Sequence, residues 1–300
     1  MGDNPNIMSG LCTPKCPTTV EKYAQSGHRA GIAYRIGPKL LDFIALYGIG
    51  LSLILGMMTG LWFLSLKLRD SSIVDIFWGT GFVIAALVYA LLVGNLSTRG
   101  AIALLLVIVW GVRLTVRIGW RNIGSGEDKR YARWRSQHGA RYWIASYFRV
   151  FLLQGVVMWI VSAPLLQALY HDAPDRLAGF DVLGIVVWLA GFGFEAVGDW
   201  QLARFRADPA NSGKVIDSGL WRYTRHPNYF GEATLWWGFF LLAVSTPGGL
   251  LTIISPILMT YLLVRVSGAA LLEGSLREEK PEYVDYIRRT SAFIPMPPKH

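Results

Sequence analysis

The segment GLWRYTRHPNYFGEATLWWGFFLLAVS, residues 219–245, is a cationic polar turn that continues directly into an apolar run. Pro227 suits the first turn of a helix, because the N–H that it lacks would have no partner inside the helix. Asn228 and Glu232 are four residues apart and therefore share one face of that helix. A carboxylate inside an apolar helix is costly unless a partner meets it, so this face is a candidate functional site. The simpler interpretation, an interfacial belt of Arg, His and Tyr, does not require the Asn and the Glu.

The composition indicates a membrane protein. Of the 300 residues 53% are hydrophobic and only 16% are charged, whereas about a quarter of the residues in soluble proteins are charged. Apolar runs of about 20 residues, the length that crosses a bilayer, recur along the chain. A secretory signal peptide is single and N-terminal, so it does not account for repeated runs. We therefore predict an all-α, polytopic bundle of about seven transmembrane helices.

The expected spans divide the chain into an extension and a membrane domain. Residues 1–38 show no apolar period and are predicted to form a flexible N-terminal extension, followed by a transmembrane domain over residues 39–300. Pro164 is expected to kink the fourth span, and a charged, amphipathic helix is expected over residues 273–289. The predicted spans are residues 40–66, 73–93, 101–119, 148–169, 182–203, 229–245 and 250–272.

The net charge of +9 has two explanations. Nucleic-acid binding is one, but the positive-inside bias of membrane proteins is the plainer one. With seven spans, the links on one side and the C-terminus carry nearly all Lys and Arg of the core, whereas the opposite links hold only Arg99 and Arg176. The basic N-terminal extension is an exception to this pattern. We predict an integral membrane protein with a cytoplasmic C-terminus and a cofactor site facing the cytoplasm, and we expect no nucleic-acid partner.

The sequence favours no metal site. Two cysteines, Cys12 and Cys16, do not supply the four ligands of a zinc site, and the five histidines are scattered without metal-ligand spacing. We therefore expect no bound metal.

Polar side chains inside the other spans are further candidates. Trp110, Arg113, Arg117 and Arg121 recur at intervals of three or four and form one stripe on the third span. Glu195 and Asp199, four residues apart, share one face of the fifth span in the same way.

Asp75, at the start of the second span, has two interpretations. It caps the helix N-terminus, where the macrodipole favours an anion, or it serves a site inside the bundle. Ser71 and Ser72 are also placed to cap this helix, and the two interpretations are equally weighted.

The turn Arg225-His226-Pro227-x-Tyr229-x-Gly231 resembles the C-terminal signature of the steroid 5-alpha-reductase superfamily, and most closely a bacterial branch described as a domain of unknown function. Integral-membrane sterol reductases and isoprenylcysteine carboxyl methyltransferases carry a related turn, so the turn alone does not separate a reductase from a methyltransferase. Five further segments extend the resemblance over residues 71–295: SIVDIFWG, VWGVRLTVRIGWRN, GEDKRY, FLLQGVVMWIVSAPL and YVDYIRRTSAFIP.

The resemblance implies a seven-helix bundle that holds NADPH between its later helices and reduces an enone in a steroid or similar lipid. The phosphates of such a cofactor require Arg and Lys at the mouth of the site, and its nicotinamide requires amide and carboxylate groups. The candidate cofactor-binding residues are Arg113, Arg117, Arg121, Glu195, Asp199, Arg206, Lys214, Tyr223, Arg225, His226, Asn228, Tyr229 and Glu232.

The candidate catalytic residues depart from the superfamily's pattern. The animal enzymes polarise the substrate ketone with a Gln-Glu pair and a tyrosine, and this sequence has no Gln-Glu pair. Asp75 is the nearest acidic substitute, acting as an electrophile if it is buried and neutral. Trp110 stands roughly where the tyrosine is expected, although an indole N–H is a poor proton source.

Three functions remain open at this stage. A membrane-embedded NADPH-dependent reductase of a lipid-like substrate is favoured by Glu232 following Asn228. An S-adenosylmethionine-dependent methyltransferase of a membrane-embedded acceptor is kept open by the His226-Pro227 turn and the Glu-rich tail. A non-catalytic lipid-binding protein would use the same bundle. Fold-level analogy does not decide between them, and the sequence indicates neither the substrate nor the oligomeric state.

Overall fold

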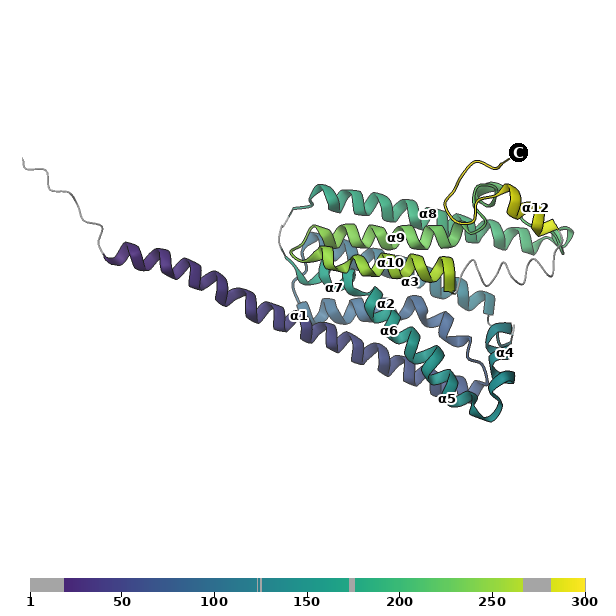
Figure 1. Cartoon of the computed structure of the whole chain (residues 1–300), viewed down its shortest axis with the longest axis horizontal. Helices are drawn as coiled ribbons and strands as arrows, with labels where there is room; N and C mark the ends of the chain where they lie inside the picture. Colours follow the sequence, from purple (N-terminus) through teal and green to yellow (C-terminus); the bar gives the residue numbers. More distant parts are fainter. Residues whose placement is uncertain (1–18, 123, 125, 173–175, 267–281, 300) are drawn as a thin grey trace, which may run out of the picture. The chain divides into compact units, whose positions relative to one another are not determined.

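The computed structural model describes residues 19–122, 124, 126–172, 176–266 and 282–299. Across these residues the chain is helical and forms no β-strand beyond one isolated bridge, which confirms the predicted all-α class (Figure 1). Six helical segments of this part are long and apolar enough to cross a membrane, so the protein is an integral membrane protein. They are Asp42–Leu68, Ile73–Val93, Thr98–Asn122, Lys129–Tyr170, Gly179–Ala207 and Gly249–Val266.

The N-terminal part of the chain differs from the expected extension. The described residues divide into two compact units, one that ends at residue 45 and one that begins at residue 46. Helix α1 spans Thr19–Leu68, so residues 19–38 are helical and the helix begins well before the apolar run. Cys12 and Cys16 lie outside the described residues, and the division of the chain at residue 39 stays a prediction.

Glycines allow the helices of the site to approach closely. Helix α2 (Ile73–Val93) packs on helix α3 (Thr98–Asn122) where Gly79 faces Gly111. A Cβ on Gly111 would lie 2.7 Å from the carbonyl oxygen of Gly79. Any side chain at this crossing therefore separates the two helices.

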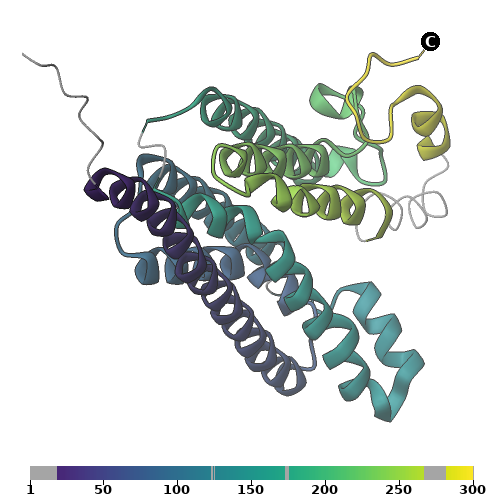
Figure 2. The same cartoon turned by 60° about the vertical axis from the view of Figure 1, so that its left-hand side comes forward.

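Glycines also allow close packing of helices α8 (Gly179–Ala207) and α9 (Pro227–Val244), at two points along their length. A Cβ on Gly184 would lie 2.8 Å from the Gly238 carbonyl oxygen, and one on Gly191 would lie 2.6 Å from that of Gly231. In each helix the two glycines are seven residues apart and therefore lie on one face. Figures 1 and 2 show α8 and α9 side by side along their length. This close packing brings the polar residues of both helices together.

Helix α9 coincides with the predicted sixth span, but it is not among the six helices that are apolar enough to cross a membrane by composition. Its first two turns carry Asn228, Tyr229 and Glu232, which lower its hydropathy. Eleven of its 18 residues are buried. The predicted sixth span is thus present as a largely buried helix.

The remaining elements complete the bundle and cover one end. The predicted kink is confirmed, because the fourth span breaks at Ser162 and Pro164 lies in the first turn of the next helix. The described elements are α4 (Lys129–His138), η1 (Gly139–Arg141), α5 (Tyr142–Ser146), η2 (Tyr147–Leu152), α6 (Leu153–Val161), α7 (Ala163–Tyr170), η3 (Pro209–Asn211), η4 (Gly219–Arg222), η5 (Gly249–Ile253), α10 (Ile254–Tyr261), η6 (Leu262–Val266) and α12 (Glu282–Arg289). Predicted residues 267–272 of the last span lie outside the described part.

Candidate functional site

The arginine stripe of α3 meets the acidic pair of α8. Arg113 forms ion pairs with both Glu195 and Asp199, and its distance from Nη2 to Asp199 Oδ2 is 3.1 Å. The indole Nε1 of Trp110 donates to Glu195 Oε2 at 3.1 Å. Glu195 is buried, with 2% of its side chain exposed. A carboxylate buried this deeply requires such partners, so the three predicted positions form one cluster.

Asp199 joins this cluster to helix α9. Its Oδ1 accepts a hydrogen bond from Asn228 Nδ2 at 3.3 Å, and its Oδ2 lies 3.9 Å from Arg117 Nε. Arg117 also donates from Nη2 to the backbone carbonyl of Asp199 at 3.5 Å. Asp199 therefore bonds side chains from α3 and α9 while lying on α8.

Glu232 supplies a third carboxyl group. It is buried, and Trp78 of α2 hydrogen-bonds to it. It lies close enough to Glu195, Asp199 and Arg113 to interact with them electrostatically. The predicted Asn228–Glu232 face thus points into the bundle. We name the group Arg113, Arg117, Glu195, Asp199, Asn228 and Glu232 the polar cluster.

Three atoms of the polar cluster lack partners. In the described part of the chain seven buried side-chain nitrogen or oxygen atoms make no hydrogen bond, and three of them are Arg113 Nε, Arg117 Nε and Asn228 Oδ1. Leaving a buried polar atom unbonded costs about 1–3 kcal/mol, and such atoms in native proteins call for an explanation. A ligand that accepts from the guanidinium groups and donates to the amide oxygen would satisfy all three.

Cationic side chains lie at the edge of the polar cluster. Arg121 and Arg206 are exposed and lie close enough to each other and to Arg117 to interact electrostatically. Arg206 has no carboxylate partner in the described part of the chain, whereas Arg121 Nε donates to Asn122 Oδ1 at 2.9 Å. Lys214 is exposed in the loop that follows α8. These positions suit contacts with an anionic ligand that reaches the cluster from outside.

Tyr229 lies close to both the polar cluster and Arg130 of α4. Its ring stacks on His226 with centroids 5.5 Å apart, and its phenol makes no hydrogen bond with another described residue. It interacts electrostatically with Glu232, Asp199 and Arg130. The phenol O–H is therefore a neutral hydrogen-bond donor that has no acceptor among the described residues.

Two residues that were predicted to contact the cofactor form hydrogen bonds with the C-terminal segment. The buried guanidinium of Arg225 donates to the backbone carbonyls of Ile287 at 3.1 Å and Thr290 at 2.7 Å. The carbonyl of Tyr223 accepts from the backbone N–H of Met296 at 3.0 Å, and its ring is exposed. These contacts fasten the segment around α12 to the turn before α9, so neither residue belongs to the polar cluster.

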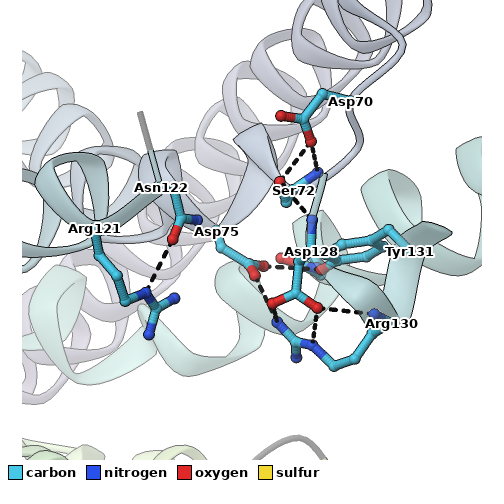
Figure 3. A network of polar contacts seen from close by, with 9 residues as sticks. Asp70, Ser72, Asp75, Arg121, Asn122, Asp128, Arg130 and Tyr131 are labelled. Carbon is cyan, nitrogen blue, oxygen red and sulfur yellow. Dashed lines mark hydrogen bonds and ion pairs between the residues drawn. The ribbon is translucent and has the colours of Figure 1, made fainter. Parts of the chain in front are cut away.

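The predicted catalytic residues are also engaged elsewhere. Asp75 accepts from Arg130 Nη2 at 2.9 Å and from the Tyr131 hydroxyl at 2.9 Å (Figure 3). Its carboxyl group therefore links α2 to α4, and it lies in the first turn of α2, where the helix macrodipole favours an anion. Its role as an electrophile stays a prediction. Ser72 precedes α2 and makes no side-chain cap. Trp110 is fully buried with its single donor bonded to Glu195, so it is not available to a substrate ketone.

A second ion pair holds α4 to the start of α2. Glu127 accepts from Arg135 Nη2 at 2.8 Å and from the backbone N–H of Ser71 at 2.8 Å. Burial raises the pKa of the Glu127 carboxyl, but the bonds from Arg135 and Ser71 outweigh burial, so this pKa lies below its ordinary value. The sequence reasoning missed these contacts, although the charged segment GEDKRY carried part of the signal.

Arg99 and Asp181 form an ion pair that the sequence reasoning also missed. Arg99 Nε lies 2.7 Å from Asp181 Oδ1, and Nη2 lies 3.0 Å from Oδ2. Asp181 also accepts from the backbone N–H of Ala178 at 2.7 Å. The pair lies on the same two helices as the polar cluster, α3 and α8, near the first turn of each. As for metals, the described residues contain no group of three His, Cys, Asp or Glu side chains placed to hold an ion.

Comparisons with known proteins identify the family. The family model described as "Protein of unknown function (DUF1295)" matches residues 61–290. An uncharacterized protein of Schizosaccharomyces pombe is 26% identical over 273 residues, which cover 83% of this chain and 78% of that protein. A Delta(14)-sterol reductase of Ascobolus immersus is 28% identical over 146 residues, which cover 43% of this chain and 31% of the reductase. No solved structure matches significantly.

These matches fit the resemblance to the steroid 5-alpha-reductase superfamily and indicate a membrane protein related to reductases. The match to the sterol reductase spans less than a third of that enzyme's length, and the assignment to a bacterial branch stays a prediction. The family model covers most of the sequence, including every residue of the polar cluster. The chain therefore belongs to the DUF1295 family.

Proposed function

We propose that the protein is a membrane-embedded reductase that transfers a hydride from NADPH to an activated C=C bond in a steroid-like or other lipid enone. The observation that carries the proposal is the set of three buried, unbonded atoms on Arg113, Arg117 and Asn228. The similarity to a Delta(14)-sterol reductase supports a reductase over the other candidate functions.

The residues of the polar cluster fit the nicotinamide end of this cofactor. A carboxamide both donates and accepts hydrogen bonds, and Asn228 offers an unbonded Oδ1 to its NH₂ group. Arg113 is held by Glu195 and Asp199, so its unbonded Nε has a fixed position. A site in which the donors are already oriented loses little entropy when it binds.

The exposed arginines fit the phosphates of the same cofactor. NADPH carries an extra phosphate beyond its pyrophosphate, and charge-assisted bonds from guanidinium groups are the strongest available. Arg206, which has no carboxylate partner in the described part, and Arg121 lie at the edge of the cluster. The cationic S-adenosylmethionine sulfonium would gain nothing from these two arginines.

The proton for the reaction is assigned to Tyr229. NADPH, when bound, supplies the hydride to one carbon of the C=C bond, and the other carbon takes a proton. The Tyr229 hydroxyl holds a proton at its phenol oxygen that no other described residue accepts. Trp110 orients Glu195, and Asp75 holds α4 in place, so both act at a distance from the reacting atoms.

A thermal-shift experiment on the purified protein in detergent tests this proposal. At a concentration a hundred times its Kd, a ligand adds about 2.7 kcal/mol to the stability, which raises Tm by about 5–10 °C for a protein of this size. We expect this rise with NADPH and not with S-adenosylmethionine. Arg206→Gln should reduce the rise, whereas Arg204→Gln, a change of another exposed arginine two residues away on α8, should preserve it.

Other outcomes contradict the proposal. A rise with S-adenosylmethionine alone would instead favour a methyltransferase. If neither compound raises Tm, the polar cluster does not bind either cofactor, and the non-catalytic lipid-binding function is favoured. A rise with NADPH that Arg204→Gln and Arg206→Gln reduce equally would mean that diffuse charge, and not this site, attracts the cofactor.

A further inference from the structure

The helical segment that follows α3 and ends with α7 is longer than a membrane crossing requires. The helical segment Lys129–Tyr170 has 42 residues, whereas about 20 residues cross the hydrocarbon core. Helices α6 and α7 with the end of η2 supply that length, so α4, η1 and α5 lie outside the hydrocarbon. Figure 1 shows α4 running across the direction of the long helices. These elements therefore lie at the level of the lipid headgroups.

The outer surface of these elements has an interfacial composition. Trp134, Trp143, Ile144 and Phe148 are all more than 40% exposed. Aromatic side chains of this kind collect where the bilayer meets water. This surface thus faces the boundary between headgroups and acyl chains.

A hollow of about 320 Å³ opens within this surface. It is lined by three apolar side chains, two arginines and a histidine. The lining residues are His138, Arg141, Ile144, Ala145, Phe148 and Arg149. Such a combination matches a molecule with an anionic head and an apolar body.

The positive charge at this hollow is not balanced within the described protein. Arg130 and Arg135, on the same helical segment, are paired with the carboxylates of Asp75 and Glu127. Arg141 and Arg149 have no carboxylate partner among the described residues. Four arginines of the segment thus form two pairs, an inner pair that fastens α4 and an outer pair that lines the hollow.

His138 orients one of these arginines. Its Nε2 lies 3.3 Å from Arg149 Nη1, and its Nδ1 lies 2.9 Å from the Trp134 carbonyl oxygen. A guanidinium only donates, so Nε2 accepts and the proton is on Nδ1, which donates to the carbonyl. His138 therefore holds Arg149 beside the hollow.

We propose that the hollow lined by Arg141 and Arg149 binds the phosphate of an acidic phospholipid, whose acyl chains lie against Ile144 and Phe148. Two guanidinium groups accommodate a phosphodiester, and basic pockets beside transmembrane helices are known to bind anionic headgroups. The site is separate from the polar cluster and does not depend on the proposed reductase function.

Native mass spectrometry of the full chain in detergent tests this assignment. The protein is titrated with phosphatidylglycerol and, separately, with phosphatidylcholine of the same acyl chains. We expect selective binding of phosphatidylglycerol, weakened about fivefold by Arg141→Gln or Arg149→Gln and about thirtyfold by both. Arg133→Gln, which removes an exposed charge from α4 outside the hollow, is the matched control and should retain binding. The double variant Arg141→Lys with Arg149→Lys should retain part of it.

Several results would overturn the assignment. Equal binding of both lipids would mean that the headgroup charge is not recognised. An equal loss in Arg133→Gln and in the double Gln variant would mean that charge acts diffusely over α4. Competition by inorganic phosphate alone would identify a free anion, and not a lipid, as the ligand. A melting curve in detergent checks that each variant is folded before it is compared.

Discussion

Helices α3 and α8 hold two groups of arginine and carboxylate that differ in completeness. Toward the beginning of each helix Arg99 and Asp181 form a two-pronged pair, with side chains only 1% and 0% exposed. Toward the end of each helix Arg113 bonds Glu195 and Asp199, yet its Nε remains buried and unbonded. The same two helices therefore carry one closed group and one open group.

From this difference we propose that the closed group is structural and that the open group is the ligand site. A buried ion pair whose hydrogen bonds are all satisfied links two helices and leaves no donor or acceptor for a ligand. A buried cluster with unbonded donors and acceptors is costly unless another molecule completes it. Removing the closed pair should therefore lower stability, whereas changes in the open cluster should lower ligand affinity more than stability.

The largest expected effect is the loss of stability in Arg99→Leu. The substitution leaves the Asp181 carboxylate buried without its counter-ion, which should cost about 3–5 kcal/mol and lower Tm by about 10 °C. Thermal unfolding in detergent measures this change. The double variant Arg99→Leu with Asp181→Leu should recover much of the loss. A single variant that melts within 2 °C of the wild type would show that the pair is not structural.

Glu195→Gln should show the opposite pattern to Arg99→Leu, with a larger effect on ligand affinity than on stability. The amide keeps the size of the side chain and still accepts from Trp110, but it removes one charge that orients Arg113. We expect about tenfold weaker binding of NADPH, equivalent to about 1.4 kcal/mol, with a smaller fall in Tm than in Arg99→Leu. Melting with and without NADPH separates the two quantities. If the Tm of Glu195→Gln without NADPH is as low as that of Arg99→Leu, the two groups contribute equally to stability. The distinction between a closed and an open group would then be wrong.

Asp75→Asn should loosen α4 and leave the open cluster intact. Asp75 and Arg130 are partly exposed, so the loss of their pair is screened and costs about 1 kcal/mol or less. Hydrogen exchange at the backbone amides of α4 should accelerate while the Tm rise with NADPH is retained. The reverse result, unchanged exchange and a lost Tm rise, would assign Asp75 to the cofactor site.

The smallest expected effect is a pH dependence from Glu127. Its pKa in the folded protein lies below the ordinary value of 4.5, so its ionised form stabilises the docking of α4 at pH values above 4.5. This contribution is lost as the pH falls through the lowered pKa. In the wild type, the protection of the α4 amides relative to their intrinsic exchange rate should therefore fall as the pH drops below 4.5 through this lowered pKa. Glu127→Gln should show the lower protection at every pH, and a parallel pH profile in both proteins would exclude this carboxyl as the cause.

Helical periodicity made much of this arrangement predictable. The intervals of three or four between Trp110, Arg113 and Arg117, and the same spacing of Glu195 and Asp199, define faces without any structure. A polar face in an apolar helix must turn inward, and this requirement joins α3, α8 and α9 at one place. The helix class, the kink before Pro164 and the inward Asn228–Glu232 face follow from the same reasoning.

Long-range partners were not predictable in this way. Arg99 was counted as a loop charge, because nothing in its neighbourhood indicates that Asp181, 82 residues away, is its partner. Arg225 stands in a cationic motif, but its bonds to backbone carbonyls of the C-terminal segment depend on how that segment folds back. The partner of Asp75 was not predictable for the same reason, since the hydrogen bond from Tyr131 depends on the position of α4.

The most direct test of the open cluster is an equilibrium titration with NADPH, followed by energy transfer from tryptophan to the reduced nicotinamide. Wild-type protein, Asn228→Ala and the control Arg204→Gln are compared in the same detergent. We predict saturable binding that Asn228→Ala weakens at least about tenfold and that Arg204→Gln leaves unchanged. Absence of saturable binding to the wild type, or equal affinity in Asn228→Ala, would contradict the account.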